Sequence, residues 1–543
     1  MSLQKLFTAR VATVFVMLFV CASLFAQNIT VKGTVKDTNG DPIVGAAVLI
    51  KGTQTGVTTD IDGNYSINVP SNATLRFTAL SYADQEVPVR GRANISVILS
   101  EDSERLAEAT VTAEFGMKRV ARAVGASVQN VKASDVSESG REAFINALQG
   151  RVAGMTVTST GGSPGSSTSV VLRSATSISG NNQPLYVVDG VPINNNTLSG
   201  ETDFAYGDAV SMYSMDFSSR GNDINPEDIE SMTILKGAAA AALYGSDASN
   251  GAIIITTKKG SAGRGKVSYS NSLRWDKAYG WPEIQQKYSN GAYGHSNYYY
   301  QSRYGAEWPD GMKLYDNVSA LLQTGFSQTH NVSVEGGTEK VTVRAAVSMT
   351  DQKGVVKTTD YQRFNATLSG KAEVTKWLNF EAKMEYVKTG NTKASKGLYG
   401  TLYRAMHWPI SDDMSVYEDE EGKMRIPDLY TDTDLLNPMY ALYKNVNRDD
   451  VNRFMGSFSA NIMPTKHTFI RATYGLDFSI GEYKVYSHPY YGDRTSSTYG
   501  YGTINYSKPT YRDNSLDVLA GYNNEFGKFS VSVQVGYHQK ENA

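Results

Sequence analysis

Phe380-Glu-Ala-Lys-Met-Glu-Tyr386 is the stretch that decides the fold of the C-terminal half of the chain. Apolar residues occupy every second position and charged residues the positions between, which is the period of a β-strand with one apolar and one polar face. The same alternation recurs in four further segments, at 364–368, 454–462, 470–478 and 529–537. About nine such strands follow residue 260, each close to the roughly 9–11 residues with which a tilted strand crosses a membrane.

The connections between these strands alternate in length. The short ones are Gly336-Gly337, Val374-Thr-Lys376, Pro464-Thr-Lys466 and Phe526-Gly-Lys528. Between them lie the longer loops, at about 278–327, 352–359, 390–450 and 480–511. Outer-membrane barrels have tight periplasmic turns and long outer loops, whereas a soluble β-sandwich or propeller has no reason to sort loop lengths by side. The sequence therefore predicts an antiparallel transmembrane β-barrel over residues 261–543.

This barrel is expected to be unfinished. About nine strands are visible, whereas the large filled barrels of the outer membrane have about 22. The chain ends at Glu541-Asn-Ala543, directly after a strand. An open sheet would leave two lipid-facing edges with unpaired backbone groups. We therefore expect the sequence to be the N-terminal part of a longer protein.

Composition excludes several classes of protein. Among 543 residues, 52 Lys and Arg stand against 54 Asp and Glu, for a net charge of −2. That balance gives no reason to expect nucleic acid as a partner. The 6 His and 1 Cys offer few ligands for a metal site. Repeated runs of about 20 apolar residues, which a helical membrane protein needs, do not occur in the sequence.

The N-terminus predicts export. Lys5 and Arg10 precede an apolar run at 11–20, and the small Ala26 precedes the polar Gln27. This order is typical of a cleaved secretory signal peptide over residues 1–26, with an N-terminal membrane anchor as the alternative. Cleavage there would remove the one cysteine, so the exported chain would use no disulfide.

Three further segments precede the barrel. Residues 27–101 predict a small β-sandwich, because Asn-Gly and Asp-Gly turns separate alternating runs. The acidic turn at 60–64 is predicted to be a plain turn, because it lacks the terminal Glu of a calcium loop. Residues 102–116 predict a charged linker with one short β-prone segment. Residues 117–260 predict a mixed α/β domain, with helices at 141–148 and 238–243 and strands at 155–159, 184–189 and 253–257.

Four motifs occur in order within this region. They are Ala147-Leu-Gln-Gly-Arg-Val-Ala-Gly-Met-Thr-Val157, Gln183-Pro-Leu-Tyr-Val-Val-Asp-Gly-Val-Pro-Ile193, Ile224-Asn-Pro-Glu-Asp-Ile-Glu-Ser-Met-Thr-Ile-Leu-Lys236 and Leu243-Tyr-Gly-Ser-Asp-Ala-Ser-Asn-Gly-Ala-Ile-Ile-Ile-Thr-Thr-Lys-Lys-Gly260. On these motifs the chain resembles the SusC/RagA type of TonB-dependent outer-membrane receptor. The resemblance covers residues 28–260 well and the barrel in pattern only.

The resemblance implies a mainly β fold in three parts. Residues 27–101 are similar to the carboxypeptidase-regulatory-like β-sandwich that precedes many such receptors. Residues 117–260 are similar to the receptors' mixed α/β plug domain. Residues 261–543 would then be the first part of the antiparallel transmembrane β-barrel that the plug fills.

The resemblance also implies a function. It is the active import of a bulky nutrient across the Gram-negative outer membrane, with oligosaccharide favoured and peptide next. TonB, driven by the inner-membrane ExbB/ExbD motor, would supply the energy, and a SusD-like surface lipoprotein would cap the barrel. The alternative is a ligand-binding surface receptor or adhesin that does not import.

One segment is the candidate binding site for TonB. It consists of Glu108, Ala109, Thr110, Val111, Thr112 and Ala113. Its β-branched centre lies among charged linker residues, so it can add as a strand to the edge of a partner's sheet. The alternative is a passive linker.

The first long loop holds the candidate contacts to ligand or lid protein. They are Trp281, Tyr298, Tyr299, Tyr300 and Trp308. Aromatic faces suit stacking on sugar rings or packing on a partner, although an interfacial aromatic girdle would use the same residues. The acidic stretch at 412–421 predicts a solvated outer loop, with divalent-cation binding as the alternative.

No catalytic constellation stands out. Gly161-Gly-Ser-Pro-Gly165 matches the pattern of a nucleophile elbow, but the residue after the serine must donate its backbone N–H to the oxyanion. Pro164 has no N–H to donate. The sequence therefore predicts no enzyme activity, no metal site and no cofactor.

Overall fold

The computed structural model divides into two compact units, residues 1–110 and 111–543. It describes residues 28–542 apart from 38–40, 44, 52–54, 61, 80–83, 100–109, 113–117, 121–127, 133–142, 160, 179–180, 196–217, 298–301, 398–399, 428–435, 493–498 and 527–528. The predicted signal peptide and most of the predicted linker lie outside the described residues.

The first unit is a β-sandwich, as the sequence predicts. Its strands are β1 (Asn28–Lys36), β2 (Ala47–Ile50), β3 (Gly56–Thr58), β4 (Asn64–Pro70), β5 (Thr74–Thr78), β6 (Gln85–Pro88) and β7 (Val97–Ile98). They form one sheet in the order β4-β1-β7 and another in the order β3-β2-β5-β6. Alternate side chains of both sheets, among them Val31, Ile67 and Phe77, share one buried core. The acidic turn before β4 is a plain turn, because the Asp60 carboxylate accepts the backbone N–H groups of Asp62 and Asn64.

The second unit begins with a mixed α/β domain. Its strands are β10 (Val128–Lys132), β11 (Met155–Ser159), β12 (Thr168–Leu172), β13 (Leu185–Val188), β14 (Val191–Ile193), β15 (Ile229–Leu235) and β16 (Ala252–Thr257). Its helical elements are α3 (Phe144–Ala147), α5 (Ala238–Tyr244), η3 (Arg220–Asp223), η4 (Pro226–Asp228) and η5 (Gly245–Ala248). Five strands form a sheet in the order β10-β15-β16-β13-β14, and β11 pairs with β12. The three predicted strands and the Ala-rich helix are confirmed, whereas the described part of the predicted 141–148 helix is the single turn α3.

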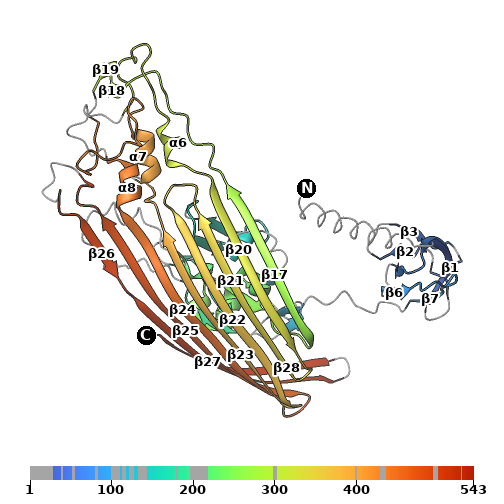
Figure 1. The fold of residues 1–543 in the computed structure, drawn as a ribbon. Coiled ribbons are helices and arrows are strands. Elements are labelled where there is room, and N and C mark those ends of the chain that lie inside the picture. Colours follow the sequence, from blue (N-terminus) through green and yellow to red (C-terminus); the bar gives the residue numbers. More distant parts are fainter. Residues whose placement is uncertain are drawn as a thin grey trace, which may run out of the picture. The chain divides into compact units, whose positions relative to one another are not determined.

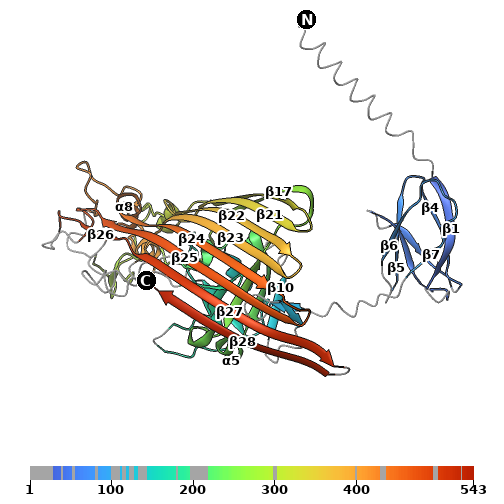
Figure 2. The same cartoon turned by 90° about the horizontal axis from the view of Figure 1, so that it is seen from below.

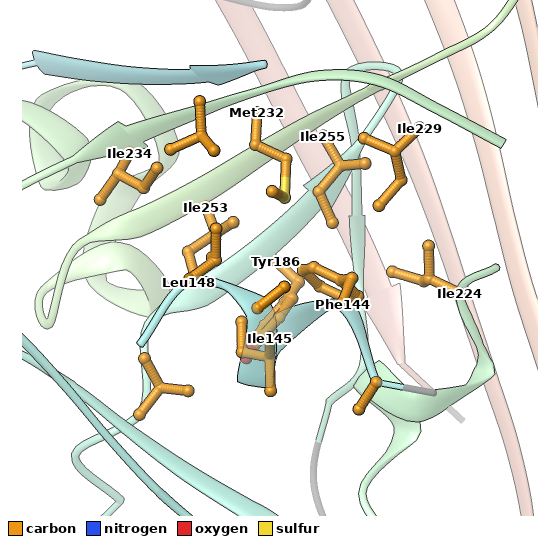
Figure 3. Packing of buried hydrophobic residues seen from close by; sticks show 14 of the residues in the cluster. Phe144, Ile145, Leu148, Tyr186, Ile224, Ile229, Met232, Ile234, Ile253 and Ile255 are labelled. Carbon is orange, nitrogen blue, oxygen red and sulfur yellow. The ribbon is translucent and has the colours of Figure 1, made fainter. Parts of the chain in front are cut away.

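This domain has its own apolar core, shown in Figure 3. Phe144 and Ile145 from α3 pack with Tyr186 of β13 and with the isoleucines of β15 and β16. Every residue of β16 is buried, as expected for a strand covered on both faces. Val387 and Met455, from the long sheet described next, belong to the same apolar cluster.

A long curved antiparallel sheet follows. Its strands are β17 (Gly263–Asp276), β20 (Gly325–Gly337), β21 (Val341–Lys353), β22 (Asp360–Thr375), β23 (Leu378–Thr392), β24 (Val446–Ile462), β25 (Thr468–Ser487), β27 (Thr510–Phe526) and β28 (Phe529–Asn542). Each pairs with the next in sequence, and β26 (Thr503–Ser507) also pairs with β25. Figures 1 and 2 show this sheet curving around the mixed α/β domain. The described strands do not close into a barrel.

The predicted strands of this sheet are confirmed but are longer than expected. The predicted turn at Gly336-Gly337 is wrong, because both residues belong to β20 and the connection to β21 is 338–340. Residues 527 and 528 of the last predicted turn lie outside the described residues. The turn from β22 to β23 spans two residues, and all four predicted short connections lie at one end of the sheet. The strands run from 13 residues in β20 to 20 in β25, beyond the roughly 9–11 that cross a bilayer. The additional strand residues extend toward the long-loop end, where β25 pairs with both β26 and β27.

The sheet buries its polar side chains and exposes its apolar ones. In β21, Arg344 and Ser348 are 4% and 2% exposed, whereas Val347 and Met349 are 44% and 60% exposed. The neighbouring strands repeat this pattern, with Leu368, Met384 and Phe458 on the outward face. Soluble proteins do not present so large a continuous apolar surface to water, whereas a membrane barrel has an apolar band outside and a polar interior.

The loops at the other end of the sheet form a small structured layer. It includes β18 (Gly291–Ala292), β19 (His295–Ser296), α6 (Asn317–Leu321), α7 (Thr401–His407) and α8 (Pro438–Lys444), and Figure 1 shows the three helices together. Trp408 is fully buried among side chains of this layer, including Leu321 and Met439. None of the helices in the described part of the chain combines the length and apolar character needed to span a bilayer.

Candidate functional site: the contact between the α/β domain and the sheet wall

The Asp189-Gly190 turn places a carboxylate against the inward face of the long antiparallel sheet, which we call the sheet wall. It joins β13 to β14 as a two-residue hairpin, in which Asp189 and Gly190 have φ angles of 50° and 92°. Both angles are positive, which is why Asp-Gly suits this turn. The Asp189 carboxylate accepts hydrogen bonds from the Thr257 backbone N–H at 2.9 Å and hydroxyl at 2.7 Å. Oδ2, the oxygen that accepts the Thr257 hydroxyl, also lies 3.4 Å from Nζ of Lys383 on β23.

Asp189 is held ionised by these contacts. Burial by itself raises the pKa of Asp189, but the Lys383 ammonium and the two hydrogen bonds from Thr257 outweigh it and leave the pKa below its usual value. A depressed carboxyl pKa contributes stability that is present above the unfolded value of about 4 and is lost as the pH falls below it.

We therefore expect Asp189→Asn to remove an acid-sensitive contact. The variant should lose about 2 kcal/mol of unfolding free energy at neutral pH, because a hydrogen-bonded charge is lost. Its stability should then fall less steeply than that of the parent below about pH 4. Urea unfolding across a pH series measures both effects. Asp450→Asn, which removes a half-exposed carboxylate paired with Arg448, should change little, and equal curves for the parent and Asp189→Asn would contradict the assignment.

Arg453 is the centre of a second, fully buried network. Projecting inward from β24, it donates to both carboxylate oxygens of Asp477 on β25, at 2.7 and 2.6 Å. It also donates to the Asp223 carboxylate of η3 at 3.0 Å, and to two backbone carbonyls of the α/β domain, those of Arg220 and Asn194. One guanidinium, 1% exposed, thus joins two wall strands to two segments of the domain.

Other wall residues repeat this arrangement with single contacts. Arg344 of β21 pairs with Asp228 at 2.7 Å. Arg363 and Asn365 of β22 donate to the backbone carbonyls of Asn222 and Asp223, at 2.8 and 2.7 Å. Asn391 of β23 donates to the Ser218 hydroxyl at 2.9 Å. Polar side chains on five neighbouring strands therefore contact the same face of the domain.

This contact differs in kind from the domain's own core. Hydrogen bonds and ion pairs contribute little net free energy when water can replace the partner, whereas apolar burial is lost outright on exposure. The interior of the sheet is polar, so water entering it can replace these contacts one at a time. The domain is therefore held against the sheet mainly by polar contacts, and Val387 and Met455 are the wall residues that join its apolar core.

The predicted loop contacts are only partly brought together. Trp281 lines a cavity of about 330 Å³ with residues that include Arg303, Tyr315 and Asn317. Trp308 is half-buried and is not among the residues that line this cavity. Tyr298, Tyr299 and Tyr300 lie outside the described residues.

The predicted TonB segment is described at its centre. Thr110–Thr112 form β8, which pairs with β9 (Lys118–Val120) in a sheet that has two strands among the described residues. Glu108, Ala109 and Ala113 lie outside the described residues.

Some carboxylates of the acidic stretch in the long loop pair with neighbouring cations. Asp412 pairs with Arg425 at 2.6 Å and accepts the indole N–H of Trp408 at 3.0 Å. Glu418 pairs with Lys444 at 2.6 Å. Within the described residues, no cluster of three or more His, Cys, Asp or Glu side chains is arranged to hold a metal ion.

Sequence reasoning missed the residues of the wall contact. Lys383 stands in the sequence only as a polar position of the alternating stretch 380–386, and no pattern singles out Arg344 or Arg453. The number of charged residues at inward positions could have indicated a contact inside the barrel, because a lumen that holds only water does not require them. Which carboxylate each cation meets depends on how the α/β domain is oriented inside the sheet.

Two family models match the chain. The TonB-dependent Receptor Plug Domain matches residues 120–252, and the CarboxypepD_reg-like domain matches residues 31–111. The first match covers the α/β domain and the second covers the β-sandwich.

Curated relatives extend over more of the chain. TonB-dependent receptor SusC of Bacteroides thetaiotaomicron is 35% identical over 355 residues, which are 65% of this chain and 33% of that protein. TonB-dependent receptor P26 of Formosa agariphila is 29% identical over 540 residues, 95% of this chain and 50% of that protein. The chain thus spans half or less of the length of these two relatives, both of which are receptors and not enzymes.

Solved structures share the fold. The RagAB peptide importer in its open-open state superposes with a TM-score of 0.59 at 20% identity, over 80% of this chain and 49% of that chain. Its closed-closed state gives 0.57 at 19% identity, over 77% and 48%. A plug domain, a preceding carboxypeptidase-regulatory-like domain and the antiparallel sheet occur in this order, and with the match to SusC they support a SusC/RagA-type TonB-dependent receptor.

Proposed function

We propose that this protein imports a bulky nutrient across the outer membrane of a Gram-negative cell, after export by the signal peptide at residues 1–26. The proposal rests on the orientation of side chains in the long sheet, where apolar residues face outward and polar residues face inward. The plug is held against the inward face mainly by polar contacts, which water can replace. Such a plug closes the lumen at rest and can be displaced by force.

The segment at 108–113 is the proposed point where TonB, driven by ExbB/ExbD, applies that force. β8 pairs along one edge with β9 within the described part of the chain, so its other edge can accept a strand from a partner. Strand addition uses backbone hydrogen bonds, which suit the transmission of a pull. Because the segment lies just before the plug in the sequence, a pull on it would act directly on the plug domain.

The long-loop layer is the proposed outer face and the docking surface for a SusD-like lipoprotein. Trp281 and Trp308 are half-buried within it, with part of each aromatic face available to a lid or to cargo. Oligosaccharide and peptide are the two cargo classes. Peptide is the cargo of the RagAB importer, whose fold this chain shares at 19–20% identity.

Deletion of residues 108–113 tests import against surface binding. We expect cells with the deletion to bind ligand normally and to lose energised uptake. Val111→Pro should act like the deletion, because proline removes a backbone N–H from the added strand. Val111→Ala should keep most of the uptake, since the backbone is intact. Ligand binding without energised uptake in the parent would identify a surface receptor or adhesin. Uptake by the deletion strain at the parental rate would show that TonB does not act through this segment.

A further inference from the structure

The β13–β14 hairpin of the plug lies close against the sheet wall. A cavity of about 20 Å³ remains between this hairpin and strands β23, β24 and β25, which is room for about one water molecule. At the long-loop end, by contrast, a cavity of about 640 Å³ lies between the plug and the wall, and Asn222 and Gln352 are among the residues that line it. The hairpin is therefore a place where the plug excludes water from the wall.

The wall opposite the hairpin is made of small residues. Gly475 of β25 is paired with Ser457 of β24 and with Ser515 of β27, so three small residues form one row across neighbouring strands. The row faces inward, because Thr473 and Asp477, two positions away on either side of the glycine, are 3% and 4% exposed. The plug strand β14 contacts both β25 and β27.

Val191 of β14 occupies the space that the missing side chain of Gly475 leaves. A methyl group on Gly475 would lie 2.3 and 2.7 Å from the two methyl carbons of Val191, and 2.6 Å from Oγ of Ser515, whereas non-bonded carbon atoms approach to about 3.5–4.0 Å. The Ser515 hydroxyl could rotate away, because it has no hydrogen-bond partner among the described residues. Val191 could not, because its side chain is 5% exposed and β-branched, and both of its methyl groups are in the way.

Charged contacts hold the hairpin on both sides of this position. Before it, Asp189 lies 3.4 Å from Lys383. After it, the Asn194 backbone N–H donates to the Asp477 carboxylate at 3.0 Å, and the Asn194 carbonyl accepts from Arg453 at 2.9 Å. A bulkier residue in the wall row would push the hairpin away from the wall and lengthen these contacts together.

We infer that Gly475 is a positioning residue for the plug: the space beside it admits Val191, and this fit keeps the lumen closed at rest. The inference rests on the proposed import function, in which the plug closes the lumen until force displaces it. It adds a steric requirement at one wall position to the polar contacts that hold the plug. Because the fit depends on size, a larger residue on the wall and a smaller residue on the plug should have opposite effects.

The test is the ion conductance of the full-length protein in planar lipid bilayers, measured without TonB. The parent should stay closed. Gly475→Ala should raise the mean conductance about tenfold, because overpacking a close contact displaces the backbone. Adding Val191→Ala to this variant should restore closure, because it removes the two methyl carbons that the new methyl group would meet. A wall that was merely weakened would not be rescued by a smaller residue on the plug.

Gly370→Ala is the matched control. Gly370 of β22 lies two residues after Leu368 on the outward face, and a methyl group there would have no neighbour closer than 3.5 Å, so this variant should stay closed. A closed Gly475→Ala variant would overturn the inference, as would a leak that Val191→Ala does not reduce. A parent that conducts freely would overturn both proposals, whereas energised uptake by a closed Gly475→Ala variant would leave the import function standing and overturn this inference alone.

Discussion

Arg453→Met is expected to lower the free energy of unfolding by about 3–5 kcal/mol. The guanidinium is 1% exposed and makes ion pairs with Asp477 and Asp223. Without it, Asp477 remains buried beside a neutral side chain, and the desolvation of its charge is no longer offset. Urea unfolding in lipid vesicles measures the loss, and faster trypsin cleavage within the plug should accompany it, because the same side chain holds Asn194 and η3.

Two further variants separate lost charge pairing from lost packing. Arg448→Met removes the same residue type from the same strand, but its partner Asp450 is half-exposed, so the expected cost is below about 1 kcal/mol. The double variant Arg453→Met, Asp477→Leu should recover part of the loss, since Asp223 keeps its pairing with Arg220 at 3.4 Å. Equal costs for Arg453→Met and Arg448→Met would show that the buried network does not hold the plug.

Val347→Arg is expected to cost about 2–4 kcal/mol when the protein is in a bilayer. Val347 lies at the middle of β21 on the outward face and is 44% exposed, so the new charge would be placed in hydrocarbon. In a soluble sheet the same exposed position would tolerate arginine at almost no cost. The measurement is the free energy of unfolding in vesicles, and it reports directly whether this face contacts lipid.

Val341→Arg is the control for depth. It places the same residue on the same face of the same strand, at the short-turn end, where Val341 is 47% exposed. Near the membrane interface the cost of arginine falls to about 0–1 kcal/mol. If both variants cost the same small amount, the outward face would not be the membrane face and the import proposal would lose its main support.

The position of Asp189 shows how far sequence reasoning reaches. The sequence predicts a strand at 184–189, and the structure confirms it as β13, but places Asp189 in the two-residue turn that follows. The turn type follows from two residues that tolerate positive φ, which is local information. That the carboxylate meets Lys383, almost two hundred residues later, follows only from the packing of the plug against β23.

The cavity at the long-loop end also depends on tertiary packing that no local sequence pattern predicts. The sequence places Gln352 at the start of the loop predicted at about 352–359, whereas the structure includes it in β21, which ends at Lys353. The meeting of Gln352 with Asn222 at one cavity required the plug to be placed inside the sheet. No spacing in the sequence relates these two residues.

The sequence by itself determined the element types, the alternation of short and long connections and the family, because period-two patterning, turn residues and consecutive motifs are local properties of the chain. Only the tertiary structure decided which inward charges pair with which plug residues, and which amides border a cavity. Those contacts join segments far apart in sequence, for example 259 residues in the hydrogen bond from Arg453 to Asn194. Their geometry is set by how one rigid body packs inside another, which no local pattern encodes.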